Sequence, residues 1–189
     1  SGIGIESSSF KYGFVHETVL EMDVLTGTGE VLTCSPEQNS ELFYAIPNSY
    51  GTLGYVLRAK LMLTPSKPYV EITRTKYTDY KEYIEANKQT ATEAREKGTY
   101  DYVDGLILNE CEMYLMPARF VDEAPFVSDY TYLDIYYKSM DKEKDYVKTK
   151  DYIFRYDTDW FWTTAAMGLQ NKLVRMLLGR KRLRSDVYY

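Results

Sequence analysis

The chain has few of the residues that build disulfide scaffolds and metal sites. Its 189 residues include two cysteines, Cys34 and Cys111, and a single histidine, His16. The cysteines lie far apart and lack a metal-ligand spacing, so no metal site is expected and a disulfide-rich secreted fold is excluded. A reduced, cytoplasmic setting is the expectation, with one disulfide left open. No nucleophile or carboxylate motif accompanies His16, which is therefore expected to be structural.

Long apolar runs and an excess of positive charge are also missing. No apolar stretch approaches the roughly 20 residues that a membrane helix requires, so no integral membrane segment is expected in these residues, while membrane association of a longer protein stays open. The chain carries 23 Lys and Arg against 28 Asp and Glu, a net charge of -5, which gives no general electrostatic case for nucleic-acid binding. The basic run 180–184 is interpreted as a solvated helix end, with contact to phosphate or a membrane surface as the alternative.

Apolar and tyrosine content is ample. Hydrophobic residues make up 44% of the chain, enough for one sizeable core or two small ones. The 20 tyrosines indicate either strand-rich structure or a lining that is half polar and half apolar.

Residues 17–63 predict a compact β-rich unit. Apolar and β-branched residues around 19–25 indicate a strand, Gly27-Thr28-Gly29 a tight turn, and Val31 the start of a return strand. Ser35, Pro36 and Gln38 match a capping box with proline at the first helical position, which predicts a short helix from Pro36. The side chains expected to bury its inner face are Leu42, Phe43 and Ile46. A glycine loop and a strand over 55–63 follow.

The prolines of the segment TPSKPY mark a linker after this unit. Beyond it the alternation and turn signals predict a mostly antiparallel sheet with flanking helices. The elements expected there are a strand over 70–77, a helix from Asp79 ending before Gly98, a hairpin of strands 102–109 and 112–121, a loop over 122–130, a strand over 131–140, a solvated charged connection over 141–145, and a helix that carries Leu169, Leu173, Met176 and Leu177 and ends at Gly179. The fold class predicted is therefore α+β.

Three runs of the first unit carry a family resemblance. The segments VLEMDVLTGTGE, NSELFYAI and GTLGYVLRAKL resemble the second FAD-binding subdomain of the vanillyl-alcohol oxidase (PCMH-type) flavoproteins. Within that superfamily, GIGIESSSFKYG and SPEQNSELFYAIP are most similar to the 24-dehydrocholesterol (delta-24 sterol) reductase branch. Cytokinin dehydrogenases share the LEMDV-TG-GE pattern more loosely. The resemblance is specific over about residues 1–70 and weaker, though persistent, beyond them.

The resemblance implies a division into two parts. Residues 1–66 would be the C-terminal part of the second FAD-binding subdomain, and residues 67–189 the N-terminal part of a substrate (cap) domain. In such flavoproteins a first FAD-binding subdomain supplies the pyrophosphate loop, so the chain is expected to be an internal fragment of a longer protein. Alone, it is expected to be inactive and not to hold FAD stably.

The resemblance also implies site residues. The positions that match FAD contacts, or that let backbone approach the cofactor, are Ser1, Gly2, Gly4, Ile5, Gly51, Gly54, Tyr55 and Val56. In the aromatic segment 152–162, Arg155 and Trp162 keep the pattern of the sterol-reductase branch, whereas Phe154 and Tyr156 replace its histidines. The catalytic residue is therefore unknown, and the weak candidates are Tyr152, Arg155 and Tyr156. An aromatic core seam is the alternative interpretation of this segment.

The function implied is that of an FAD-dependent oxidoreductase that transfers a hydride between flavin and a small organic substrate. Alkene reduction of a sterol-like compound, with NADPH as a candidate reductant of the flavin, and alcohol oxidation both remain open. The alternative is a non-catalytic ligand-binding or interaction domain that uses a tyrosine-rich sheet surface. The oligomeric state is not predicted.

Overall fold

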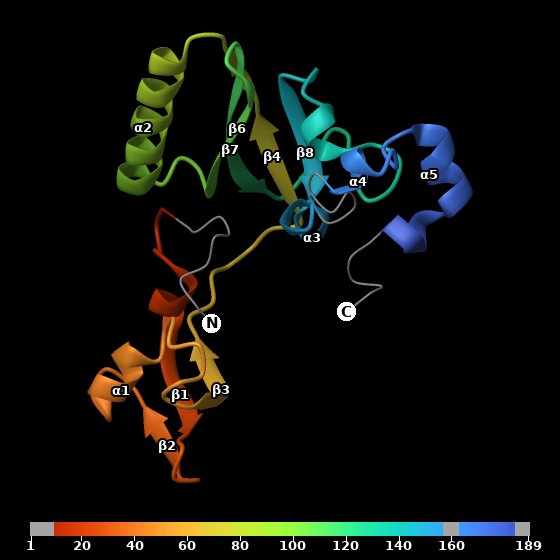
Figure 1. Ribbon diagram of the computed structural model, residues 1–189. Helices are drawn as coiled ribbons and strands as arrows, with labels where there is room; N and C mark the ends of the chain where they lie inside the picture. The colour runs from red at the N-terminus through yellow and green to blue at the C-terminus, as the bar shows by residue number, and fades with distance from the viewer. Residues whose placement is uncertain (1–9, 157–162, 184–189) are drawn as a thin grey trace. The chain divides into compact units, whose positions relative to one another are not determined.

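The computed structural model describes residues 10–156 and 163–183 (Figure 1). The chain divides into two compact units, residues 1–65 and 66–189, which are described separately. Both contain helices and antiparallel strands, which confirms the predicted α+β class. No helix in the described ranges is both long and apolar enough to cross a bilayer.

The first unit is a three-stranded antiparallel sheet in the order β2-β1-β3. The predicted hairpin is confirmed, because β1 pairs with β2 from Met22 opposite Cys34 to Leu25 opposite Val31. Gly29, at φ +86°, supplies the left-handed residue of the turn. The elements of this unit are η1 (Val15–Thr18), β1 (Val19–Leu25), β2 (Val31–Cys34), α1 (Ser40–Ala45) and β3 (Tyr55–Leu61).

The core of the first unit lies between α1 and one face of the sheet. The predicted inner face of the helix is correct, since Phe43 and Ile46 are buried and Leu42 packs against them. The buried members of this core are Met22, Val24, Cys34, Phe43 and Ile46.

The predicted start of this helix at Pro36 is wrong. The hydroxyl of Ser35 does accept hydrogen bonds from the backbone N–H groups of Glu37 and Gln38, at 3.2 and 3.1 Å. These bonds close a turn, however, and Asn39 then adopts a left-handed conformation at φ +49°, which interrupts any helix from Pro36. Helix α1 therefore begins at Ser40.

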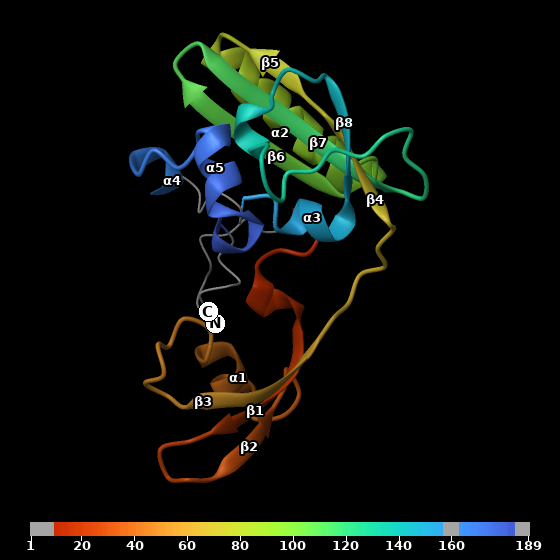
Figure 2. The same cartoon turned by 90° about the vertical axis from the view of Figure 1, so that its right-hand side faces the viewer.

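The second unit contains a five-stranded antiparallel sheet (Figure 2). Strand β7 is central and pairs with β4, β5 and β6, while β8 pairs with the far side of β4. The predicted hairpin is confirmed at both strands, and the predicted long helix is confirmed from its N-cap Asp79 to its left-handed C-cap Gly98. The strands and long helix are β4 (Tyr69–Thr73), β5 (Thr75–Tyr77), α2 (Tyr80–Lys97), β6 (Tyr102–Asn109), β7 (Glu112–Val121) and β8 (Lys144–Lys148).

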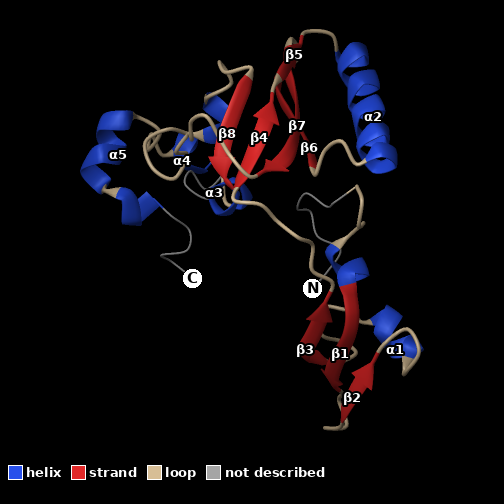
Figure 3. Cartoon of the chain, turned by 180° about the vertical axis from the view of Figure 1, so that it is seen from behind, coloured by secondary structure: helices blue, strands red, loops and turns tan. Residues whose placement is uncertain are grey.

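Both faces of β7 are buried, because its alternate side chains enter two different clusters. Met113 and Leu115 pack with Tyr83 under α2. Met116 and Ala118 belong to the larger cluster on the other face, which is covered by the shorter helices (Figure 3). Those shorter elements are η2 (Tyr136–Lys138), α3 (Thr149–Ile153), α4 (Thr163–Ala166), α5 (Lys172–Leu178) and η4 (Arg180–Leu183). The end of the last predicted helix at Gly179 is confirmed.

Three predictions for this unit need correction. The strand expected over 70–77 is split into β4 and β5 at Arg74, whose side chain turns inward and is buried. The strand expected over 131–140 does not form; this stretch consists of turns and η2, and it buries Tyr136. The stretch 141–145 is not a simple solvated connection, because β8 begins at Lys144 and Asp145 is completely buried.

Candidate functional site

The predicted cofactor-contact residues 51–56 lie together, on a loop and on the first two residues of β3 that follow it. Gly51 and Gly54 both have positive φ angles, +80° and +152°. A Cβ atom on Gly54 would lie 2.6 Å from the backbone oxygen of Leu25, so β1 itself requires a glycine there. Packing within the unit therefore accounts for the glycine at position 54, and any contact of Gly54 with a ligand would be made by its backbone.

The side chains around this loop present an apolar, aromatic surface. Tyr50 is 89% exposed and Tyr55 is 68% exposed, and Leu53 and Val56 are exposed beside them. None of the residues 49–56 carries a charge. A flat isoalloxazine ring fits such a wall, whereas the pyrophosphate of FAD would need donors from elsewhere. The other predicted contacts, Ser1, Gly2, Gly4 and Ile5, lie outside the described residues.

The three weak catalytic candidates come together in the second unit. The guanidinium of Arg155 lies 4.1 Å from the ring centroid of Tyr152 and 4.9 Å from that of Tyr156. Arg155 also forms an ion pair with Asp104, and the hydroxyl of Tyr152 donates to the same carboxylate at 3.2 Å. Trp162, the remaining residue of the predicted pattern, lies outside the described residues.

These interactions fix the protonation of the cluster. Burial raises the pKa of Tyr152 well above its ordinary value, and the negative charge of Asp104 adds to the rise. Burial acts to lower the pKa of Arg155, but Tyr152 and Asp104 outweigh it and hold that pKa above its usual range. At neutral pH the cluster thus contains the guanidinium of Arg155 and the protonated phenol of Tyr152, both held by the carboxylate of Asp104. Arg155 and Tyr152 can donate hydrogen bonds, and the carboxylate of Asp104 is already occupied by both of them.

Accessibility separates the candidates. Tyr152 is 1% exposed, and its hydroxyl is already directed to Asp104, which favours a supporting role. Tyr156 is only partly buried, and its ring meets that of Tyr136 edge-on at 5.4 Å. Of the two tyrosines, Tyr156 is therefore the better placed to reach a bound molecule.

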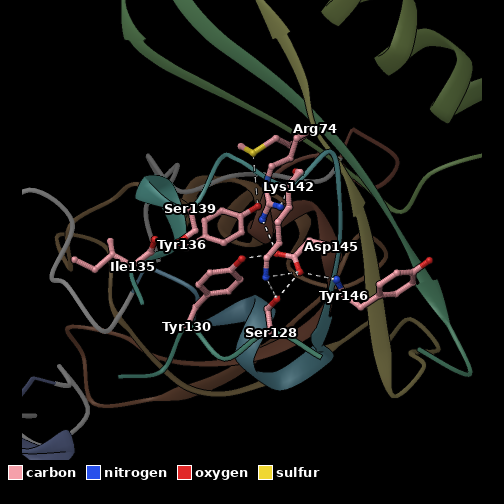
Figure 4. A network of polar contacts seen from close by, with 10 residues as sticks. Arg74, Ser128, Tyr130, Ile135, Tyr136, Ser139, Lys142, Asp145 and Tyr146 are labelled. Carbon is pink, nitrogen blue, oxygen red and sulfur yellow. Dashed lines mark hydrogen bonds and ion pairs between the residues drawn. The ribbon is translucent and has the colours of Figure 1, made fainter. Parts of the chain in front are cut away.

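A second polar network lies beside Tyr136 and was missed in the sequence (Figure 4). The buried carboxylate of Asp145 accepts hydrogen bonds from Arg74 at 2.8 Å, from Ser128 at 2.5 Å and from the hydroxyl of Tyr130. The guanidinium of Arg74 lies 5.5 Å from the ring centroid of Tyr136, and that of Arg155 lies 5.4 Å from the same centroid. One tyrosine ring thus lies near the guanidinium groups of a buried ion pair and of a largely buried one.

The same network shifts the ionisation of its members. Burial acts to raise the pKa of Asp145, but hydrogen bonds from Ser128, Tyr130 and Arg74 outweigh it and hold this pKa below its ordinary value. Burial and the hydrogen bond to Asp145 raise the pKa of Tyr130 to about 12. Nothing in the sequence indicated that Asp145 is buried, because it stands in the charged run DKEKD, which is typical of a solvated segment.

A cavity of about 480 Å³ opens beside this network. The ammonium of Lys142 donates to the hydroxyl of Ser128 at 2.7 Å and lies 5.7 Å from the ring centroid of Phe126. Three lysines and three aspartates line the cavity, so it has no strong preference for one sign of charge. The lining residues are Phe126, Val127, Ser128, Asp129, Tyr130, Asp134, Lys138, Ser139, Asp141, Lys142 and Lys172.

Comparison with known proteins identifies relatives for both units. The chain is 28% identical to the human Delta(24)-sterol reductase over 172 residues, which cover 85% of this chain and 33% of that protein. It is 34% identical to cytokinin dehydrogenase 4 of Oryza sativa subsp. japonica over 136 residues, 68% of this chain and 25% of that protein. It is 35% identical to cytokinin dehydrogenase 1 of Arabidopsis thaliana over 108 residues, 57% of this chain and 18% of that protein. No family model matches the chain.

These matches confirm the resemblance drawn from the sequence. The chain is homologous to FAD-binding PCMH-type oxidoreductases. Within that class its relatives include both the Delta(24)-sterol reductases and the cytokinin dehydrogenases. The chain spans a third or less of the length of the three relatives compared.

Proposed function

We propose that this chain is part of an FAD-dependent oxidoreductase that transfers a hydride between flavin and a small organic substrate. The observation that supports the proposal most strongly is the match to the human Delta(24)-sterol reductase, which covers 85% of the chain and so extends over both units. A non-catalytic ligand-binding domain would not by itself account for the similarity to sterol reductases and cytokinin dehydrogenases, which are FAD-dependent enzymes.

In this proposal the two units have different tasks. Residues 1–66 form part of the FAD-binding subdomain, where Gly51, Gly54, Tyr55 and Val56 provide an apolar wall for the cofactor. Ser1, Gly2, Gly4 and Ile5 remain the other proposed contacts. Residues 67–189 form part of the domain that covers the substrate. When bound, FAD supplies the hydride chemistry, while these residues orient the reactants and exclude water.

The charge state of the Arg155 cluster determines what it contributes. Because Tyr152 stays protonated and Arg155 stays charged, the cluster would provide hydrogen-bond donors and positive potential beside a reacting centre. Tyr156 would be the donor nearest the substrate. Neither Arg155 nor Tyr152 would serve as a proton acceptor in these charge states.

The direction of the reaction is the finer part of the proposal. The names of the relatives describe opposite reactions, reduction in one group and dehydrogenation in the other. We favour alkene reduction of a sterol-like compound, with NADPH as the reductant of the flavin, because the match to the sterol reductase covers more of the chain.

The test uses the native protein, purified together with any sequence that precedes or follows these residues. Its flavin should be bleached anaerobically by NADPH and recover when a sterol with a side-chain alkene is added. Bleaching by an alcohol or an amine, with no response to NADPH, would instead assign the reaction to dehydrogenation. A protein without flavin, and without affinity for added FAD, would contradict the proposed function as a whole.

A further inference from the structure

Helix α5, drawn in blue in Figure 1, exposes an apolar stripe among the described residues. Leu173, Met176 and Leu177 are 69%, 58% and 87% exposed. Their i, i+3, i+4 spacing places the three side chains on one face of the helix. Arg175 is completely buried and donates to the backbone oxygen of Tyr132 at 2.8 Å, so the helix is fixed to the unit with its apolar stripe outward.

The surrounding segment has an unusual charge pattern. The chain as a whole has a net charge of -5, yet residues 160–185 contain no Asp or Glu. The cationic residues in that stretch are Lys172, Arg175, Arg180, Lys181, Arg182 and Arg184. The 3-10 helix η4, which directly follows α5, exposes Lys181 and Arg182.

Acidic side chains from another segment hold the two ends of this region. Lys172 pairs with Asp134 at 2.5 Å, and Arg180 lies 3.7 Å from Asp129. These contacts neutralise part of the charge and position the segment. The apolar stripe of α5 and the exposed Lys181 and Arg182 of η4 adjoin along the chain.

We propose that α5 and η4 form a contact surface for a bilayer that contains anionic lipids. Apolar side chains on one helical face, flanked by lysine and arginine, are the combination that binds at the boundary between headgroups and acyl chains. The cations match the negative headgroups, and the stripe provides the apolar area that a soluble phosphate would not use. Charge complementarity favours an anionic lipid surface over a protein partner of mixed charge, since residues 160–185 carry no acidic side chain and the carboxylates of Asp129 and Asp134 are already paired with Arg180 and Lys172.

Vesicle co-sedimentation of the 189-residue chain tests this proposal. The chain should sediment with vesicles of phosphatidylcholine and phosphatidylserine, more weakly with phosphatidylcholine alone, and less as salt is added. Lys181→Glu with Arg182→Glu should weaken binding by about fivefold for each cation removed. Leu173→Ser with Leu177→Ser should abolish the remaining binding to either vesicle.

Matched variants on α2 control for general effects of polarity and charge. Tyr80 and Ile84 are exposed to a similar extent, at 57% and 56%, so Tyr80→Ser with Ile84→Ser should leave vesicle binding unchanged. Lys88→Glu with Arg95→Glu makes the same change in charge as the η4 variant and should have little effect. Circular dichroism of each variant verifies that it folds.

Three results would overturn the proposal. They are no sedimentation with either vesicle, equal loss of binding in the α2 controls, and a dimer in sedimentation velocity that Leu173→Ser with Leu177→Ser dissolves. The last result would assign the stripe to contact between copies of the chain.

Discussion

Replacing Asp145 by asparagine should unfold the second unit far more easily than its conservative size suggests. The substitution keeps the shape of the side chain, removes its negative charge and replaces one acceptor oxygen by an amide NH2 group. Arg74, whose side chain is 1% exposed, then remains buried without the carboxylate that it contacts at 2.8 Å. Tyr130 and Ser128 also lose a charged acceptor.

The expected cost is about 3–5 kcal/mol of unfolding free energy, because breaking a buried ion pair leaves an uncompensated charge in a region of low dielectric constant. Urea unfolding followed by circular dichroism measures this directly. The matched control is Glu93→Gln, which breaks the pair with Lys97 on α2, where the two side chains are 47% and 67% exposed. That pair should contribute only about 0.5 kcal/mol or less.

Both substitutions replace a carboxylate by an amide, so the difference between their effects on stability reports the burial of the two sites. Equal destabilisation by Asp145→Asn and Glu93→Gln would refute the reasoning that the Asp145 network is a buried, low-dielectric site. Adding Arg74→Met to Asp145→Asn should recover part of the loss, because the orphaned charge is then removed as well.

Acid titration provides an independent check on the same carboxylate. Because the pKa of Asp145 is lowered in the folded state, its contribution to stability is complete above its unfolded pKa of about 3.9 and is lost as pH falls through the folded-state pKa. The difference in stability between the native chain and Asp145→Asn should therefore be constant near neutral pH and shrink below about pH 4. A difference that grew on acidification would contradict the direction of the pKa shift.

Two glycines give further predictions. Gly54→Ala should destabilise the first unit by about 1–3 kcal/mol, because the residue has φ +152° and the new Cβ would meet the backbone of β1. The control is Gly27→Ala, which has nothing within 4 Å of its Cβ position and should cost less than about 1 kcal/mol. Hydrogen exchange of the β1 amides measures the stability of the first unit in both variants, and an equal loss of stability in the two would contradict the structure. Gly105→Ala should destabilise the second unit by about 1–3 kcal/mol through a clash with the hydroxyl of Tyr83, and less in a Tyr83→Phe background. A double-mutant cycle without coupling would exclude this contact.

The sequence predicted best the elements whose signals are local. The hairpin 102–109 and 112–121 was found because both strands alternate and their turn is short. The long helix was found because an aspartate is typical of a helix start and a glycine of a helix end. In the structure Asp79 accepts from the backbone N–H groups of Lys81 and Glu82, and Gly98 ends the helix.

The predictions that failed share a physical cause. In each, backbone groups or charged side chains find their hydrogen-bond or ion-pair partners outside the local pattern. The stretch 131–140 alternates like a strand, but Asp129 accepts from the N–H of Thr131, and the carbonyl of Tyr132 is taken by Arg175. Burial of Asp145 depends on Arg74, which is 71 residues away. No local pattern contains that information.

The candidate site was predicted only through the family resemblance. Local reasoning identified a glycine loop at 51–54, and the structure shows that Gly54 is required by packing against β1. The cluster of Tyr152, Arg155 and Tyr156 was recognised as unusual, but its partner Asp104 lies on β6 and could not be identified from spacing.

The flavin content of the native protein, purified with any flanking sequence, tests the central claim most directly. Val56 and Val31 are exposed strand valines of the first unit, at 41% and 55%, but only Val56 belongs to the proposed cofactor wall. Flavin absorbance should be present in the native protein, strongly reduced in Val56→Asp and retained in Val31→Asp. A colourless native protein that binds no added FAD, or equal flavin retention in both variants, would contradict the account.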